Sequence, residues 1–464
     1  MNFKKQNISK YFNKQLFFNK NANNQKDYKL FGIIPFVKIK WEDAGNVIIK
    51  YYYLFAIIPF FKTRRNNNTN TLTYWLFCFI PLLKLSGLEQ NKVIMEINST
   101  KEDILNELQV QKFRETNIAP NTVAVVEMDC HGEVFPSIVN YFLRLGYKVH
   151  LFLASDAKDT TEYKPLTRTD FDIEIFYIRE KMFCDILANS IYFTNYKYVF
   201  FPTIFEAGDY LQDAICKYSG NNIYYINHCS NPAIENNLSV QAKFLYDELF
   251  EKNRVFSIKP NVKNIPNFAV CTYFGDNIKP HKKNEITTFI CGGGAWKSKL
   301  RNFDLLLASA KTLTKKHQFK LLFIGISEQN LPQGFEEIKD YIQIVGRTGY
   351  TDFYDKVESG DFILWNIDNT CEDYNKYLYH GTSGNYGLSL GFHKISIIEQ
   401  KLAETHNFNE ENALLYTDNL VEVMEKAIKM SNSDYKKMSE KLVELKNGLE
   451  NMSLKNMKRV FGEA

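Results

Sequence analysis

Apolar runs of strand length alternate with helix-spaced patterns after residue 120. Residues 123–126 are apolar and β-branched, which predicts a buried strand. Residues 136–145 have apolar positions at helical spacing, and Gly146 ends the pattern. Residues 147–153 form the next strand-type run. Short connections between strand, helix and strand predict a β-α-β unit with parallel strands.

The same alternation fills two consecutive blocks. The first adds strand-type runs at 173–178, 198–201 and 223–227 and ends near residue 268. The second restarts at 286, with a helical pattern at 303–313 and strand-type runs at 287–291, 319–324, 342–345, 362–365 and 395–398. The pattern predicts an α/β fold with two Rossmann-like parallel-sheet domains, residues 118–268 and 286–430, facing a cleft and joined by a linker at 269–285. Ligands of such sheets bind beyond the carboxyl ends of the strands.

Helices are expected on both flanks of this body. Ser99 and Glu102 form a capping-box pattern, so residues 98–117 are predicted to be a linker helix. Residues 431–464 are predicted to be a C-terminal helix, with helical character clearest over 431–450. Its apolar residues recur at steps of four and three, and we expect that face to pack on the body; a coiled-coil partner is the alternative.

A repeated unit precedes the body, within residues 1–97. Residues 30–38 (LFGIIPFVK), 54–62 (LFAIIPFFK) and 76–84 (LFCFIPLLK) are three copies of one pattern. Proline within each apolar run argues against a central strand or an unbroken helix. Two interpretations stay open: segments that dip into a lipid headgroup layer, or a small hairpin cap packed on the body.

Charge separates this basic arm from the rest of the chain. Residues 1–88 hold 14 Lys and Arg against three acids, a net charge of 14 − 3 = +11, whereas the whole 464-residue chain is +4. Such an arm favours an anionic partner, with an anionic membrane surface a possibility through residues 1–88. Lysine interleaved with Ile, Leu and Pro disfavours nucleic acid.

Compartment and metal binding can also be predicted from composition. The longest apolar runs, 51–61 and 74–83, are too short to span a bilayer, and no secretory signal is recognisable. Eight cysteines form no CxxC, which disfavours a zinc site and fits reduced thiols. We therefore expect a cytoplasmic protein without a bound metal.

Two glycine-rich loops of the second domain suit a phosphate ligand. Glycines at 292–294 follow a predicted strand, and we expect them to open a helix whose N-terminus supplies N–H donors. Candidate diphosphate contacts there are Gly293, Gly294, Lys297 and Lys299. The second loop, residues 380–387, adds Thr382, Ser383 and Gly384. Neither GxGxxG nor GxxxxGK[ST] is present, and simple turns with solvated cations are the alternative.

Acid–base candidates follow the strands of the first domain. His131 comes after the first strand and could act as general base on an acceptor hydroxyl, or merely cap the next helix. Glu133 lies in the same loop. Glu206 and His228 follow later strands and could line an acceptor site.

The order of these motifs resembles a GT-B glycosyltransferase of the family 4-like group. Residues 287–294 with Lys299 and 301–313 are similar to the first strand, glycine turn and basic loop of the donor domain. Residues 344–347 with 350–354 resemble its "VG…Y.DL" region, 359–363 its "..ADV." region, and 382–398 its donor-binding loop, helix and strand. Residues 129–153 are similar to the strand–His–helix–strand opening of the acceptor domain. The repeats resemble those of bacterial surface-polysaccharide transferases.

The resemblance implies transfer of a sugar from a nucleotide diphosphate sugar to a lipid-linked or surface-glycan acceptor. It adds Arg347 to the donor-side candidates and implies no metal and no further cofactor. The chain departs from the family pattern at the donor loop, where His380 and Leu388 stand at the positions of two usual glutamates. The alternatives are a sugar-nucleotide epimerase of the same fold and a non-catalytic, membrane-attached glycan-binding protein.

Overall fold

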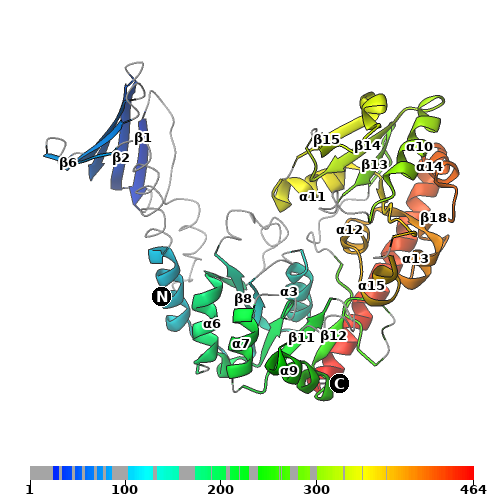
Figure 1. Ribbon diagram of the computed structural model, residues 1–464. Coiled ribbons are helices and arrows are strands. Elements are labelled where there is room, and N and C mark those ends of the chain that lie inside the picture. Colours follow the sequence, from blue (N-terminus) through cyan, green and yellow to red (C-terminus); the bar gives the residue numbers. More distant parts are fainter. Residues whose placement is uncertain are drawn as a thin grey trace, which may run out of the picture. The chain divides into compact units, whose positions relative to one another are not determined.

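The computed structural model shows two compact units, Met1–Glu107 and Leu108–Ala464, which are described separately (Figure 1). The described residues are 25–30, 34–43, 47–54, 58–66, 71–76, 80–85, 103–128, 133–155, 173–189, 191–204, 209–218, 220–228, 239–260, 262, 264–271, 281–292, 300–327, 330–346, 348–371 and 374–463. Residues 103–115 are helical, inside the predicted linker helix. The boundary between the two units falls within this helix.

The first unit holds one antiparallel sheet with its strands in chain order. Its strands are β1 (Gln25–Leu30), β2 (Ile34–Asp43), β3 (Val47–Leu54), β4 (Ile58–Asn66), β5 (Thr71–Leu76) and β6 (Ile80–Leu85). Each copy of the sequence repeat connects a hairpin, β1–β2, β3–β4 or β5–β6. The three repeats are therefore structural repeats as well.

The structure contradicts the expectation that proline keeps these runs out of central strands. Pro35, Pro59 and Pro81 are the second residues of β2, β4 and β6, and β4 lies inside the sheet. Each proline lies beside a register shift in the pairing with the preceding strand. A bulge leaves one ladder position unpaired, and so a residue without an N–H is tolerated there.

The second unit begins with a six-stranded parallel sheet, the N lobe. Its strands are β7 (Thr122–Glu127), β8 (Lys148–Ala154), β9 (Ile173–Ile178), β10 (Tyr198–Phe201), β11 (Ile223–Asn227) and β12 (Val255–Ser257), in the order β12-β11-β10-β7-β8-β9. The helices are α3 (Phe135–Arg144), α6 (Glu180–Ala188), α7 (Asp209–Lys217) and α9 (Val240–Glu251), with a short 3₁₀ turn η1 (Phe193–Asn195). This is the doubly wound strand order of the Rossmann fold.

A second parallel sheet repeats that order and forms the C lobe. Its strands are β13 (Thr287–Cys291), β14 (Phe319–Ile324), β15 (Ile342–Val345), β16 (Phe362–Leu364), β17 (Ile395–Glu399) and β18 (Ala413–Tyr416), in the order β15-β14-β13-β16-β17-β18. Its helices are α10 (Phe303–Thr314), α11 (Tyr350–Ser359), α12 (Gly384–Phe392), α13 (Gln400–Thr405) and α14 (Leu420–Lys429), with 3₁₀ helix η4 (Phe335–Tyr341) and π-helix η5 (Lys376–His380). The predicted fold class, two Rossmann-like parallel-sheet domains, is confirmed.

Alternate residues of the buried strands fill separate cores on the two faces of each sheet. In β7, Val126 packs in a cluster with Phe183 of α6, whereas Val125 packs in a cluster with Ile138 of α3. Helices cover both faces of a parallel sheet, so its strands read as continuous apolar runs. This burial is why the sequence pattern located most strands.

Helix α15 (Asn432–Phe461) packs on both lobes. Ser431 caps its start by accepting a hydrogen bond from the Asp434 N–H, and Gly462 ends it at φ +70°. Leu442 and Leu449 are buried in the C-lobe core, whereas Met457 is buried in an N-lobe core. The helix is thus longer than the clearest part of the predicted pattern, and its apolar face packs on the body. Among the described residues, no helix has the length and apolarity of a bilayer span.

Asp361 joins the interdomain connection to the amino ends of the C-lobe strands. Its fully buried carboxylate accepts hydrogen bonds from His281 Nε2 at 2.8 Å, Asn284 N at 2.9 Å and Thr288 N at 2.7 Å. Burial alone would raise the pKa of this carboxyl group, but the donors outweigh it and lower the pKa. This end of the sheet is therefore fixed by satisfied polar contacts.

Candidate functional site

The strand order directs attention to the carboxyl ends of the two sheets. In each lobe the order reverses between the first and fourth strands, β7 and β10 in the N lobe and β13 and β16 in the C lobe. Loops diverge at such a switch point and leave a crevice outside the sheet, where ligands of this fold bind. The residues that follow β7, β10, β13 and β16 are thus the first candidates.

The N-terminus of α12 lies at this edge of the C lobe. Ser383 is the N-cap, and its Oγ accepts a hydrogen bond from Asn385 N at 3.3 Å. Gly384 is exposed, and a Cβ built on it would meet nothing within 4 Å among the described residues. Three of the predicted phosphate contacts, Thr382, Ser383 and Gly384, therefore surround a helix N-terminus with open space in front of it. Asn385 N and Tyr386 N donate to Ser383, so the helix dipole and the remaining N–H groups of the first turn favour an anion there.

Buried polar atoms next to this N-terminus lack partners. Within the part of the chain that the structure describes, Thr382 Oγ1 and Asn385 Nδ2 have no hydrogen-bond partner, and Asn385 is only 3% exposed. Buried polar groups normally find a partner in protein, water or ligand. These two atoms are thus available to a bound molecule.

A third such atom lies directly after β16. Asn366 Oδ1 is buried without a partner in the described ranges, and Asn366 has a positive φ of 43°. Its carbonyl accepts from Asn302 N at 3.1 Å, so the segment before α10 is fixed against the segment after β16.

Arg301 places a cation at the same switch point. Its Nη1 donates to the Trp365 carbonyl, and its backbone forms a β-bridge with Ile367. Burial lowers the pKa of Arg301, although an arginine remains charged at neutral pH. A fixed positive charge therefore accompanies the open helix N-terminus.

At the corresponding edge of the N lobe, two described polar side chains have partners within the chain. Glu127 ends β7, and its Oε2 accepts a hydrogen bond from Thr203 Oγ1 at 2.9 Å, both residues being buried. His228, a predicted acceptor-side residue, follows β11, and its Nε2 lies 2.8 Å from the Pro202 carbonyl oxygen. Glu127 and His228 thus contact residues of one loop, the one that follows β10.

Direct contacts join the two lobes near these edges. Tyr350, the first residue of α11, donates to Glu133 Oε2 at 3.0 Å. Because Glu133 follows β7 and Tyr350 follows β15, the carboxyl ends of both sheets border the same region. A second contact involves Lys259, whose buried Nζ donates to the Tyr377 carbonyl at 2.7 Å. Desolvation lowers the pKa of Lys259 to about 7.

Several predicted site residues lie outside the described residues. They are His131, Glu206, Gly293, Gly294, Lys297, Lys299 and Arg347. Gly292, directly after β13, is the last described residue before this gap. A helix opened directly by these glycines would fall outside the described residues and stays a prediction. The helix predicted at 303–313 is confirmed as α10, which begins at Phe303 and is capped by Asn302, whose Oδ1 accepts from Leu305 N at 3.0 Å.

The two positions that depart from the family pattern have different surroundings. His380 ends the π-helix η5, directly before the loop that leads to α12. Leu388 lies inside α12 and is buried in the C-lobe core. An apolar residue there is explained by packing.

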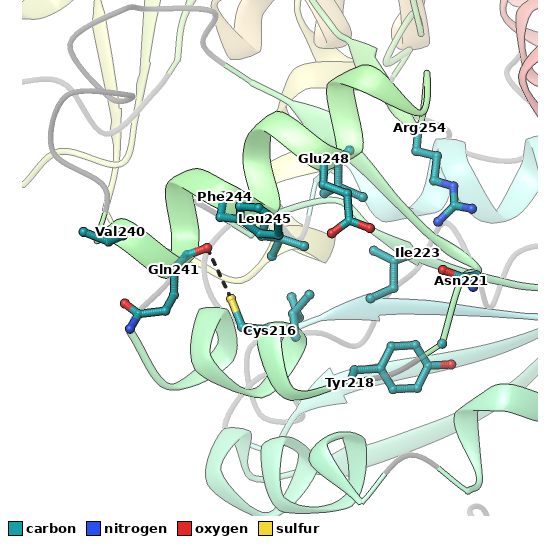
Figure 2. Close-up of a pocket in the computed structure, with 13 residues that line it drawn as sticks. Cys216, Tyr218, Asn221, Ile223, Val240, Gln241, Phe244, Leu245, Glu248 and Arg254 are labelled. Carbon is teal, nitrogen blue, oxygen red and sulfur yellow. Dashed lines mark hydrogen bonds between the residues drawn. The ribbon is translucent and has the colours of Figure 1, made fainter.

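A separate pocket lies away from these edges. Figure 2 shows it between α7 and α9, with Tyr218 and Asn221 near one end and Val240 near the other. Its volume is about 490 Å³. It borders Ile223, the first residue of β11, and so lies toward the amino end of that strand. The pocket therefore does not belong to the candidate site.

Sequence reasoning missed some of the polar residues at the edges. Glu127 could have been noticed as a charge that ends a buried apolar strand. Asn385 lies in the predicted loop 380–387 but was not chosen there, and Asn366 carries no signal in the sequence, because it is the absence of a partner in the described part of the folded chain that marks both.

Comparisons with solved structures return glycosyltransferases. AviGT4, a glycosyltransferase involved in avilamycin A biosynthesis, is 10% identical and covers 74% of this chain and 99% of its own, with a TM-score of 0.46. The E. coli heptosyltransferase WaaC with ADP is 10% identical over 66% of this chain and 99% of its own, with a TM-score of 0.38. Arabidopsis thaliana UGT89C1 complexed with quercetin is 11% identical over 74% and 99%, with a TM-score of 0.43. No family model matches the sequence, and no curated protein does either.

Proposed function

We propose that this chain is a glycosyltransferase of the GT-B type that transfers a sugar from a nucleotide diphosphate sugar to a lipid-linked or surface-glycan acceptor. The observation that carries the proposal is the open N-terminus of α12, with buried Thr382 Oγ1 and Asn385 Nδ2 left without partners among the described residues. This arrangement suits an oxygen-rich anion at the place where Rossmann-type sheets bind nucleotides.

The C lobe would hold the donor. Thr382, Ser383 and Gly384 would contact the diphosphate together with the predicted contacts Gly293, Gly294, Lys297, Lys299 and Arg347. Arg301, whose guanidinium is fixed on the Trp365 carbonyl, would add positive potential. Negative charge grows on the diphosphate as the sugar bond breaks, and preorganised N–H donors stabilise that charge.

The N lobe would hold the acceptor. His131 is the candidate base that takes the proton from the acceptor hydroxyl. The oxygen of that hydroxyl then attacks the sugar carbon that bears the diphosphate. Glu133 and His228 lie at the same edge, and Glu206 follows β10 in the chain. The contact of Glu133 with Tyr350 of the C lobe supports an acceptor edge that borders the donor edge.

Nucleotide binding tests the donor site directly. A panel of nucleotide diphosphates and their sugar conjugates is titrated calorimetrically into the full chain. We expect one nucleotide to bind and Lys299→Ala to weaken it at least tenfold, with Ser431→Ala, a change at the N-cap of α15, as control. No binding by any nucleotide contradicts the proposal. Product analysis with and without acceptor separates transfer from epimerisation.

Localisation and membrane contact are part of the proposal. A cytoplasmic enzyme, peripheral on the inner face of the membrane through residues 1–88, would meet a lipid-linked acceptor, and the +11 charge of the arm supports attraction to anionic lipid. Removal of residues 1–88 should abolish association with anionic vesicles. Unchanged association would contradict this part alone.

A further inference from the structure

Lys259 joins the backbone of the N lobe to polar groups of the C lobe. It follows β12 by two residues, and its backbone is held within the N lobe: its N–H donates to Ser257 Oγ at 3.1 Å, and its carbonyl accepts from Asn267 Nδ2 at 3.1 Å. Its side chain bonds to the C lobe, and the residue is only 2% exposed. Lys259 is therefore a buried contact between the lobes.

Three acceptors of the C lobe surround the Lys259 ammonium group. Its Nζ donates to the Tyr377 carbonyl of η5 at 2.7 Å and to Oγ1 of Thr405, the last residue of α13, at 3.3 Å. The third acceptor is Nε2 of His406, also at 3.3 Å. An ammonium group has three N–H donors and no acceptor, so these three groups match its charged form.

The hydrogen bonds of the His406 ring decide which nitrogen faces Lys259. Nδ1 lies 2.8 Å from the Leu402 carbonyl oxygen. Because a carbonyl oxygen only accepts, Nδ1 carries the ring proton, and Nε2 is left as the acceptor for Lys259. Burial and the charge of Lys259 lower the pKa of His406 to about 3, so the ring is neutral at pH 7.

The neutral His406 ring packs against two aromatic residues of the proposed donor edge. Its centroid lies 5.1 Å from that of Trp365 and 5.4 Å from that of Tyr386, and all three residues are fully buried. Trp365 carries the carbonyl that accepts from Arg301, and Tyr386 lies in the first turn of α12. Close-packed interiors transmit displacements, so a shift of His406 would reach the N-terminus of α12.

We propose that Lys259 is a positioning residue for the donor site: through His406 it holds the first turn of α12, so that donor affinity depends on this contact between the lobes. The inference rests on the proposed function, because it concerns the same helix N-terminus. Lys259 itself does not contact the donor in this arrangement. Coupling of this kind is reciprocal, and a bound donor would therefore stabilise the interlobe contact.

The charge of Lys259 makes this contact depend on pH. Desolvation lowers the pKa of Lys259 to about 7. A neutral amine offers two N–H donors to the three acceptors, so the contact should weaken as the pH rises through about 7. Of the described titratable side chains around Nζ, that of His406 contacts it directly. The others, on η5 and α13, are Lys376, Tyr377, Tyr379, His380, Lys401 and Glu404.

The test compares two buried lysines in the full chain. Lys259→Met removes the ammonium group and keeps the length of the side chain. Lys394→Met is the matched control, because Lys394 is 1% exposed, burial also lowers its pKa to about 7, and its Nζ donates to the Glu358 carbonyl. Lys394 directly precedes β17 and so lies at the opposite end of the C-lobe sheet from the donor edge.

Hydrogen exchange measured by mass spectrometry reports on α12 without any ligand. We expect the backbone amides of residues 384–388 to exchange about fivefold faster in the Lys259→Met variant, because the first turn loses its support. Exchange of these amides in the Lys394→Met variant should match the unchanged chain.

Calorimetry at pH 6 and pH 8.5 measures donor affinity, with UDP-glucose, ADP-glucose and GDP-mannose as probes. These probes have no terminal phosphate, whose pKa of about 6 would add a pH dependence of its own. We expect the affinity of the unchanged chain to fall about threefold from pH 6 to pH 8.5. Lys259→Met should bind about fivefold more weakly at pH 6 and lack that pH dependence, whereas Lys394→Met should behave as the unchanged chain.

Several outcomes overturn the inference. Unchanged exchange of residues 384–388 in Lys259→Met would mean that Lys259 does not hold α12, whatever the nucleotide result. Equal losses of affinity in the two lysine variants would mean general destabilisation. Equal affinity of the unchanged chain at both pH values, a measurement that needs no variant, would remove the role of the ammonium group.

The same measurements separate this inference from the proposed function. If a nucleotide sugar binds the unchanged chain and Lys259→Met equally, the positioning role is wrong and the transferase proposal stands. If no nucleotide sugar binds the unchanged chain while exchange of α12 is faster in Lys259→Met, the donor site is wrong. The contact would then be structural alone, and the inference would fall with the donor site.

Discussion

The two lobes share one strand order and differ in the chemistry at the carboxyl ends of their strands. In the N lobe, the buried Glu127 carboxylate and Thr203 hydroxyl satisfy each other at 2.9 Å. In the C lobe, Thr382 Oγ1, Asn366 Oδ1 and Asn385 Nδ2 have no partner in the described ranges. An unpaired buried polar group costs about 1–3 kcal/mol. In the proposed arrangement, a bound donor would supply partners for these three atoms.

The difference shows that topology alone does not assign a site. Both sheets have a switch point of the same kind, yet the C lobe combines unpaired polar atoms with an open helix N-terminus and a half-buried arginine. The N-lobe edge instead carries groups that contact one another or, through Glu133, the C lobe. Substitutions at the two edges should therefore differ in whether they change stability or binding.

The largest effect is expected at the opposite, amino end of the C-lobe strands. Asp361→Ala should lower the free energy of unfolding by about 3–5 kcal/mol, because the buried Thr288 N–H and the half-buried donors of His281 and Asn284 lose their acceptor. Urea denaturation measures the loss. Asp352→Ala, an exposed acid of α11, is the control and should stay within about 0.5 kcal/mol. Equal stability of the two variants would contradict a structural role for this end.

Acid should destabilise both lobes through buried histidines. Burial lowers the pKa of His150 in the N lobe to about 4 and of His406 in the C lobe to about 3. Between these values and the ordinary pKa of about 6.5, the unfolded chain binds protons that the folded chain does not, so stability falls as the pH falls. The loss should be about 2 kcal/mol per histidine from pH 7 to pH 5, measured by urea denaturation. Constant stability over this range would contradict burial of the neutral rings.

Thr203→Val tests the satisfied edge. The variant removes a donor from the buried Glu127 carboxylate and should cost about 1–3 kcal/mol of stability. Nucleotide affinity in calorimetry should not change, because the N lobe does not hold the donor in the proposed arrangement. A loss of nucleotide affinity without a loss of stability would reverse the assignment of the two edges.

Thr382→Val is the matched change at the open edge. Its hydroxyl has no partner within the described part of the chain, so the variant should be more stable, by up to about 1–3 kcal/mol. Nucleotide affinity should fall about fivefold to tenfold, since one hydrogen bond to the ligand is lost. Thr382→Ser keeps the hydroxyl and should retain affinity. Unchanged affinity in the valine variant would exclude this hydroxyl from the donor site.

The smallest effect is expected where the two edges meet. Tyr350→Phe removes the hydrogen bond to Glu133 and should cost about 0.5–1.5 kcal/mol of stability. Glu133→Gln keeps an acceptor and should cost less. If the phenylalanine variant costs nothing, the contact does not help to hold the lobes together.

Most strands could be read from the sequence because parallel strands are buried on both faces. The runs predicted at 123–126 and 395–398 lie inside β7 and β17. Gly146 and Gly325 have the positive φ expected of glycines that end an element. The sixth strand of each sheet was missed. β12 has three residues and β18 four, but β10, β15 and β16 are as short and were predicted, so length alone does not explain the two misses.

In the repeated arm, the prediction from the sequence was wrong. Proline was read as a barrier to a strand, yet Pro59 lies in a strand inside the sheet, where a neighbouring bulge removes the need for its N–H. A repeat can be counted from the sequence, but the register that divides its residues between two faces comes only from pairing between strands.

The sequence by itself determined the local elements, the two α/β blocks and the small-residue loop at 380–387, because burial, helical spacing and turn chemistry act between neighbours along the chain. Only the tertiary structure decided that the Thr203 hydroxyl donates to Glu127 and the Tyr350 hydroxyl donates to Glu133. It also decided that Thr382 Oγ1 and Asn385 Nδ2 have no partner in the described part of the chain. Whether a polar atom has a partner depends on residues distant in the chain, and no local pattern records that.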